Sequence, residues 1–378
     1  MSEAGMVKIE VHFSTLTDPR IERTKRHPLI NIIMIAICAV ICGAETWVDI
    51  QAYGEAKCEW LGRFLDLTNG IPSHDTFGRV FALLDAKQFE ACFLSWIRDV
   101  FPVTSRQVVA VDGKQLRRSH DKAHGKAAIY MVSAWAEANR LVLGQVKVDE
   151  KSNEITAIPE LLSLLDVSDC IVTIDAIGTQ EAIAEQIIEQ GGDYVLTLKG
   201  NQGLMHQAVE ELFDDARTND FAHLSHDFHR TVDSNHGRLE IRRHWVTSDI
   251  AWLPQVTGKP LWPGLRSVGM IEAERRIGEE TTIETRYFLL SLDSNAAAFA
   301  HAARSHWGIE NSVHWVLDVA FREDDCRIRK GNAPQNFAVL RHIALNLLHQ
   351  EKTAKVGVKA KRLKAAWNDD YLLKILSV

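Results

Sequence analysis

The order of secondary structure predicted for residues 106–202 limits the possible fold more than any other feature of the chain. Apolar, β-branched runs lie at 107–112, 127–136, 140–148, 170–175 and 193–202. Helical patterns separate the last three of these runs. The resulting β-β-β-α-β-α-β order predicts an antiparallel meander followed by crossovers into a parallel part. We therefore expect an α/β sheet that is covered by helices on both faces.

Two aspartates end two of these predicted strands. Asp112 ends the run QVVAVD and Asp175 ends CIVTID, and in this strand order the two strands can be neighbours. Ligand sites in α/β sheets form at the carboxyl ends of strands. Two aspartates side by side would repel each other unless a cation lay between them. Taken singly, Asp112 before Gly113 is also typical of a turn, and Asp175 of a strand-end cap.

A third carboxylate lies on a helix predicted within residues 304–327. The apolar residues of this stretch recur at helical spacing and predict one buried side: Trp307, Val313, Leu317 and Phe321. His306, Glu310 and His314 follow one another at four-residue steps, so they should share a face. A solvated polar stripe is the alternative interpretation of that face.

Glu310 facing the two aspartates would complete a cage of oxygen ligands. Such a cage suits Mg²⁺ or Mn²⁺ better than Zn²⁺. Two of these ions, about 4 Å apart, activate a water or a 3′-hydroxyl and stabilise the departing oxygen of a phosphodiester. Rival acids precede a predicted helix, where the helix dipole stabilises acids in any case: Asp149, Glu150 and Glu154.

The remaining segments are expected to be helical at both ends. The apolar run Leu29–Cys42 is too short for a bilayer, which needs about 20 residues, so it predicts a buried helix. Residues 69–84 predict a turn and an amphipathic helix capped by Ser73, as in a DNA-reading module or any helical bundle. Residues 203–290 have the pattern of a β-rich insertion.

Charge is distributed unevenly along the chain. The net charge is −7, yet basic residues outnumber acidic ones between Arg322 and Lys364. This asymmetry predicts a polyanionic partner, with a solvated helical face as the alternative. The acids Glu323, Asp324 and Asp325 are expected to pair with Arg327 and Arg329 rather than to bind metal. The cysteines contain no CxxC pair, which favours a reducing cytoplasm.

Several long motifs occur in one order along the chain: AVDGK at 110–114, KSNEITAIPELL at 151–162, TIDAIG at 173–178, LKGNQ at 198–202, HGRLEIR at 236–242 and HWGIENSVHWVLDVAFREDDCRIRKGNAP at 306–334. With these motifs the chain resembles the DDE transposases of bacterial insertion sequences, above all the branch associated with H-repeats of Rhs elements. The N-terminal segments ICAVICGAETWVDI and NGIPSHDTFGRVF resemble that branch as well.

The resemblance implies an α/β fold in three parts. Residues 1–100 would form a helical, DNA-binding N-terminal domain, and residues 101–335 an RNase H-like catalytic core with its insertion at about 203–290. A basic helical tail would follow at 336–378. Asp112, Asp175 and Glu310 would be the catalytic triad and would bind two divalent metal ions, Mg²⁺ or Mn²⁺.

The function implied is metal-dependent DNA cleavage at the ends of an insertion element, followed by strand transfer. The expected partners are double-stranded DNA, as terminal inverted repeats and as target, and a second copy of the chain when DNA is bound. No membrane is expected, and the location would be cytoplasmic. The alternatives are a catalytically inactive DNA-binding descendant that acts as a regulator, and a hydrolase whose zinc is held by His306, Glu310 and His314 alone.

Basic side chains near these motifs are expected to contact DNA: Lys114, Lys199, Arg238, Arg242, Arg304 and His314. For the two lysines an ordinary surface position is the alternative. The wider group carries Tyr and Arg before the catalytic Glu and a basic residue after it. This chain has Ala303 and His306 before Glu310 and Leu317 after it. The hypothesis is that Arg304 and the two neighbouring histidines take over those phosphate contacts.

Overall fold

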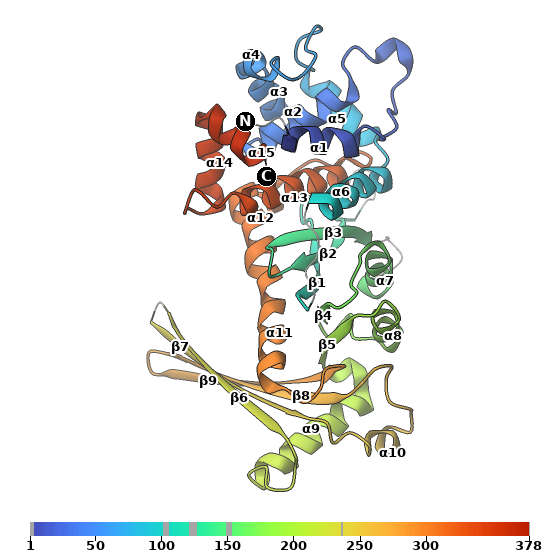
Figure 1. Cartoon of the computed structure of the whole chain (residues 1–378), viewed down its shortest axis with the longest axis vertical. Helices are drawn as coiled ribbons and strands as arrows, with labels where there is room; N and C mark the ends of the chain where they lie inside the picture. Colours follow the sequence, from blue (N-terminus) through green and yellow to red (C-terminus); the bar gives the residue numbers. More distant parts are fainter. Residues whose placement is uncertain (1–3, 101–105, 121–126, 149–152, 236, 378) are drawn as a thin grey trace.

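The computed structural model describes the chain except for residues 1–3, 101–105, 121–126, 149–152, 236 and 378. Two of the rival acids, Asp149 and Glu150, lie outside the described residues. The described part is elongated, with a helical region at one end, a sheet in the middle and the insertion at the other end (Figure 1).

Five strands form the centre of the sheet: β1 (Val108–Gln115), β2 (Tyr130–Ala136), β3 (Leu141–Val148), β4 (Ile171–Ile174) and β5 (Asp193–Leu198). Their order is β3-β2-β1-β4-β5. β1 pairs antiparallel with β2 and parallel with β4, and β4 pairs parallel with β5. This arrangement confirms the predicted meander with a parallel part, and it is that of an RNase H-like core.

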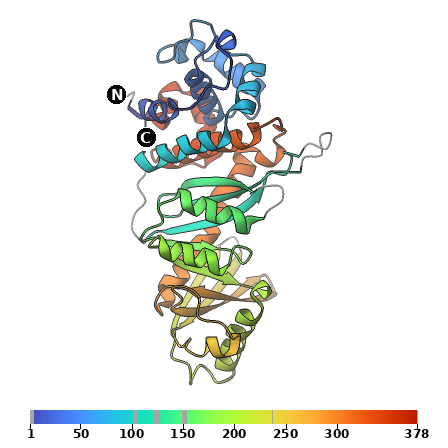
Figure 2. The ribbon, with the colours of Figure 1, turned by 90° about the vertical axis from the view of Figure 1, so that its right-hand side faces the viewer.

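Helices cover both faces of this core, as the sequence predicts. α7 (Glu154–Leu164) and α8 (Glu181–Glu189) lie on one face, and α11 (Ala296–Ile309) lies on the other (Figures 1 and 2). α7 begins where the Asn153 side chain accepts a hydrogen bond from the Ile155 N–H. All four residues of β4 are buried between the two helical layers.

The β-rich insertion enlarges the same sheet rather than forming a second one. It comprises α9 (Gly203–Thr218), β6 (Asp227–Asn235), β7 (Arg238–Thr247), α10 (Leu253–Thr257), β8 (Ser267–Ile277) and β9 (Glu280–Leu290). β9 pairs with β5, and the order continues β9-β8-β7-β6 to give nine strands in the described part. The sequence does not predict β6, because DFHRTVDSN lacks an apolar alternation; pairing with β7 fixes it at the edge.

The N-terminal and C-terminal helices form one helical region (Figure 1). These helices are α1 (Ala4–Phe13), α2 (Leu29–Ile41), α3 (Trp47–Ala56), α4 (Cys58–Leu61), α5 (His74–Leu83), α6 (Ala86–Val100), α13 (Ala333–Gln350), α14 (Val358–Trp367) and α15 (Asp369–Leu376). α2 is buried from Asn31 to Ile41, as expected. No helix in the described ranges is long and apolar enough to cross a membrane.

The tail drawn from the sequence at 336–378 does not stand apart from the rest. It begins inside α13, which is buried along most of its length between the N-terminal helices and the sheet. Arg362 donates a hydrogen bond of 2.8 Å to the Val40 carbonyl of α2, and Lys361 donates one of 2.8 Å to the Leu348 carbonyl. Both side chains are buried, so part of the basic charge that predicts a polyanionic partner does not face solvent.

Candidate active site

Neighbouring strands bring Asp112 and Asp175 together. Val111 of β1 pairs with Ile174 of β4 in parallel register, and each aspartate is the next residue along its chain. The prediction that the two strands are neighbours is therefore confirmed. The alternative of a turn at Asp112 is wrong, because β1 continues through Gly113 while β2 still supplies backbone partners.

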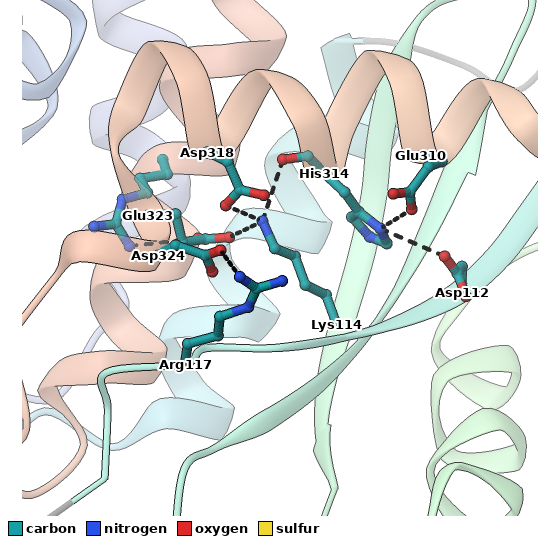
Figure 3. Close-up of polar contacts among 9 residues, drawn as sticks. Asp112, Lys114, Arg117, Glu310, His314, Asp318, Glu323 and Asp324 are labelled. Carbon is teal, nitrogen blue, oxygen red and sulfur yellow. Dashed lines mark hydrogen bonds and ion pairs between the residues drawn. The ribbon is translucent and has the colours of Figure 1, made fainter.

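Glu310 opens a short π-helical segment, Glu310–His314, between α11 and α12 (Trp315–Phe321). The Trp315 N–H donates to the Glu310 carbonyl, five residues back, and such turns are frequent at functional sites. Glu310 and His314 point toward Asp112 (Figure 3). His306 has another partner, since its Nδ1 lies 3.1 Å from the Thr173 hydroxyl on β4.

His314 lies between the two carboxylates. Its Nδ1 is 3.2 Å from Glu310 Oε2 and 3.4 Å from Asp112 Oδ2. One ligand atom from each of these residues lies within 4.8 Å of the others. Asp175 is next to Asp112 but is not a member of this group. The buried Nε2 of His314 has no hydrogen-bond partner among the residues that the structure describes.

The electrostatics of the two carboxylates differ. Burial raises the pKa of Asp112 to about 6; His314 and the Gly113 N–H oppose this shift, while Asp175 and Glu310 add to it. The hydrogen bond with His314 lowers the pKa of Glu310, whose side chain is 58% exposed. Asp112 is thus a buried acid among other acids, and Glu310 is a solvated carboxylate that one imidazole orients.

These residues fit a divalent cation. The carboxylates of Asp112 and Glu310 come from separate elements and converge, and a cation between them would relieve the repulsion that helps to raise the pKa of Asp112. Oxygen donors of this kind suit Mg²⁺ or Mn²⁺. A zinc site made of His306, Glu310 and His314 alone does not match, because Asp112 rather than His306 joins the other two residues.

Glu154, the third rival acid, lies beside the site. A Cβ built on Gly113 would stand 2.6 Å from its Oε1 and 2.5 Å from the Tyr130 ring, so a larger residue after Asp112 would have to displace these side chains. The Tyr130 hydroxyl donates a hydrogen bond to Glu154. Burial raises the pKa of Glu154, and Asp175 adds to the shift. The sequence pattern does not predict that Tyr130 lies beside the site, because only the pairing of β1 with β2 places it opposite Gln115.

The basic residues expected to contact DNA fall into two groups. Lys199, which follows β5, and Arg304 on α11 are exposed. Arg242 instead pairs with Asp233 at 2.6 Å and with Glu240, and Arg238 pairs with Glu240 at 2.9 Å. Arg238 and Arg242 are therefore paired with acids of the insertion, whereas the Lys199 and Arg304 side chains are exposed to solvent.

Lys114 also has acidic partners. Its ammonium lies 2.5 Å from Asp318 Oδ1 and 3.1 Å from Glu323 Oε2 (Figure 3). The side chain is only 14% exposed. Its role as a DNA contact stays a prediction. These ion pairs indicate a role within the protein instead.

Two expectations for the segment around Glu310 are wrong. Glu323 pairs with Arg341 and Lys114, and Asp324 pairs with Arg117, so the acids do not pair with Arg327 and Arg329. The acids pair with these residues because the chain turns back against β1 after α12.

Trp307, the first residue of the expected buried side, is instead 43% exposed, with the Arg286 guanidinium 4.8 Å from its ring centre. The other three residues of the expected buried side, Val313, Leu317 and Phe321, are buried as predicted.

Comparison with known proteins agrees with this architecture. The sequence profile described as "Transposase DDE domain" matches residues 77–347, and the one described as "DDE_Tnp_1-associated" matches residues 11–97. The chain is 43% identical to the "H repeat-associated putative transposase YhhI" of Escherichia coli K12 over 98% of both chains. It is 42% identical to the "Putative transposase YncI" of Escherichia coli O157:H7, over 97% of this chain and 93% of that one.

A solved structure, the cryo-EM "piggyBac transposase synaptic complex with hairpin DNA", covers 100% of this chain and 82% of its own. It is 11% identical in sequence with a TM-score of 0.45, and at that distance it says nothing about mechanism. The matched profile and the relatives that align over nearly the whole chain establish the family. The chain belongs to the DDE transposase family and is similar over its whole length to H-repeat-associated transposases.

Proposed function

We propose that the chain cuts DNA at the ends of its own insertion element and joins the freed 3′ ends to target DNA. One observation supports this most: Asp112 on β1 lies beside Asp175, which directly follows the adjacent parallel strand β4, while Glu310, on the facing helix, shares His314 with Asp112. We infer that the three carboxylates together hold two divalent ions, Mg²⁺ or Mn²⁺. The descriptions of the two relatives named above, both of which contain the words "putative transposase", agree with this activity.

Each residue has a part in the proposed reaction. Asp112, whose charge is costly where it lies, would hold a cation together with Asp175 and Glu310. Bound ions would supply a Lewis acid for the scissile phosphate and would make a water or 3′-hydroxyl a better nucleophile. His314 would keep the solvated carboxylate of Glu310 aimed at Asp112. The exposed Lys199 and Arg304 would contact backbone phosphates and hold the strand over the site.

The proposed partners follow from the reaction. The protein would bind double-stranded DNA, first as the terminal inverted repeats and then as target. Two ends must be brought together, so we propose a homodimer on DNA, which sizing of the protein with a repeat duplex by analytical ultracentrifugation would test. The place of action would be the compartment that holds the DNA, which in bacteria is the cytoplasm.

A nicking assay tests the proposal. The purified chain would be mixed with a duplex carrying the inverted repeat that flanks its gene, in Mg²⁺, Mn²⁺ or EDTA. We expect cuts at the repeat end that require metal and that fall by about two orders of magnitude or more in Asp112→Asn, Asp175→Asn and Glu310→Gln. Asp293→Asn, at an exposed acid in the same sheet region, is the control.

The outcomes separate the alternatives. Retained repeat binding in the three triad variants, measured by gel shift, would assign the loss to chemistry. Full activity of one variant would remove that residue from the triad. Specific binding without cuts under any metal would support the other function, a catalytically inactive DNA-binding descendant that acts as a regulator.

A further inference from the structure

We propose that Lys114 is a positioning residue that fixes the helix bearing Glu310 against the strand bearing Asp112. The inference rests on the proposed function, because it concerns the same carboxylates. It assigns to Lys114 a role inside the protein in place of a contact with DNA.

The position of Lys114 on β1 places it next to the site. Side chains two residues apart on a strand point to the same face, so Asp112 and Lys114 both point toward the helix that carries Glu310 (Figure 3). Asp112 contacts the imidazole of His314, and Lys114 donates a hydrogen bond of 3.2 Å to the carbonyl of His314. One strand thus holds both the side chain and the backbone of the residue that orients Glu310.

The ammonium group of Lys114 has no donor left for an external phosphate. Lysine carries three N–H donors. The three acceptors within reach are the His314 carbonyl at 3.2 Å, Asp318 Oδ1 at 2.5 Å and Glu323 Oε2 at 3.1 Å. All three belong to the chain that runs from the π-helical segment into the turn after α12, so Lys114 ties three consecutive parts of that segment to β1.

The cost of removing this cation is high because one of its two acidic partners, Glu323, is almost fully buried. Glu323 is 2% exposed at its side chain. Burial alone would raise the pKa of Glu323, but Arg341 and Lys114 outweigh burial and hold the pKa below its usual range. A buried carboxylate that loses one of its two cations either takes up a proton or moves toward water. Either change would release the turn that follows α12.

Further ion pairs extend the same connection. Glu323 lies 3.4 Å from Arg341 of α13, so the same carboxylate also links the turn to the helical region.

Two more ion pairs place the turn alongside the residues that follow β1. Asp324 pairs with Arg117 at 3.2 Å, and Asp325 pairs with Arg118 at 3.3 Å. The pairs of Asp324 and Asp325 are more exposed than the contacts of Lys114, and exposed pairs are worth little. The buried pairs of Lys114 therefore carry most of the connection.

Metal binding in the absence of DNA tests the inference on the full-length chain. We would measure Mn²⁺ affinity by isothermal titration calorimetry for the wild type, Lys114→Met and Lys87→Met, the last as a control at a lysine whose side chain is 88% exposed on α6. We expect Lys114→Met to weaken Mn²⁺ binding about tenfold, as removal of an outer partner of a metal ligand does, and Lys87→Met to leave it unchanged.

Two further variants keep the result decisive. If circular dichroism shows that Lys114→Met does not fold, Asp318→Asn removes the charge of one partner at a side chain that is 33% exposed, and a smaller loss of Mn²⁺ affinity is expected. Glu310→Gln tests the site itself. If Glu310→Gln binds Mn²⁺ as the wild type does, the proposed metal site is wrong; if it loses Mn²⁺ while Lys114→Met does not, only the role of Lys114 is wrong.

DNA binding gives a second readout. A lysine that contacts a phosphate contributes about one unit to the slope of log affinity against log salt concentration. We expect Lys114→Met to leave that slope at the wild-type value for an inverted-repeat duplex. A slope reduced by about one unit, with Mn²⁺ affinity intact, would overturn the inference and establish Lys114 as a DNA contact.

Discussion

His314 Nδ1 lies 3.2 Å from Oε2 of Glu310, the carboxylate one helical turn before it. The imidazole is 6% exposed and the carboxylate side chain 58% exposed. A buried ring therefore fixes the direction of a side chain that solvent would otherwise leave free to change rotamer. The same Nδ1 is 3.4 Å from Asp112, so the ring also sets how far Glu310 stands from the strand.

Removal of this ring should loosen the site without removing a carboxylate. We expect His314→Gln to weaken Mn²⁺ binding by about tenfold, since the outer partners of metal ligands contribute on that scale. Asn311→Ala is the matched control, because Asn311 is exposed on the same segment and, within the described part of the chain, its side-chain amide bonds only to the Trp307 carbonyl. Calorimetric titration of both variants measures the effect. Equal affinities for the two variants would show that Glu310 needs no orientation from His314.

The charge of Asp112 should destabilise the metal-free fold. Its pKa is raised from 3.8 to about 6, so the folded state holds the proton more tightly than the unfolded state, and stability falls as pH rises through that window. Well above pH 6 Asp112 is charged in the folded state, and the full destabilisation by its buried charge is present. Asp112→Asn should therefore be more stable than the wild type at pH 7.5 in EDTA, by about 3 kcal/mol.

Chemical denaturation at two pH values checks this prediction. At pH 4, where the wild-type carboxyl is protonated in the fold, the difference between Asp112→Asn and the wild type should largely disappear. Asp293→Asn removes an acid whose side chain is 88% exposed and should change stability little at either pH. A variant no more stable than the wild type at pH 7.5 would mean that Asp112 carries no such cost.

The two groups of basic residues should respond differently to substitution. Arg304 is exposed, so Arg304→Ala should weaken binding to a repeat duplex and lower the salt slope by about one unit. Arg242, paired with Asp233 and Glu240, should mainly support the insertion, so Arg242→Ala should leave the salt slope unchanged and lower the denaturation midpoint. Gel shifts over a salt series, with urea denaturation of both variants, distinguish the two roles. A lower slope for Arg242→Ala would place it on the DNA path.

Local sequence patterns predict the elements of the core well. Each buried strand corresponds to an apolar run, and the helices show apolar residues at helical spacing. Ser73 is an example of a cap predicted from the sequence that also caps a helix in the structure. β6 is not predicted from local sequence, because its mostly polar residues form a strand only through backbone hydrogen bonds to β7. The same holds for the continuation of β1 past Asp112, which β2 enforces.

The candidate site was predictable in its residue types but not in its contacts. Asp112 and Asp175 follow from strand order, and Glu310 from helical spacing. The inward direction of Lys114 depends on a turn that brings Glu323 back from more than two hundred residues away, and local spacing carries no information on such a contact. The π-helical segment likewise has no local sequence pattern that would predict it.

The segment after that turn docks on the helical region through a close backbone approach. Gly331 has a φ of +54°, and a Cβ placed on it would collide with the Ala82 carbonyl at the end of α5. The next residue, Asn332, donates its backbone N–H to the same carbonyl at 3.1 Å. Only glycine allows both the left-handed backbone and the approach.

Substitution of Gly331 should therefore destabilise the chain from a position far from any charge. We expect Gly331→Ala to lose about 3 kcal/mol, part from the left-handed conformation and part from the displaced contact with Ala82. Gly357→Ala is the matched control, because Gly357 has open space around its Cβ position and an ordinary φ of −66°; as the N-cap of α14 it should lose only about 0.5 kcal/mol on substitution by alanine. Urea denaturation followed by circular dichroism measures both. A Gly331→Ala midpoint equal to that of Gly357→Ala would show that the junction between α5 and α13 can yield, and that the backbone contact at Ala82 does not hold the segment after Glu323 in place.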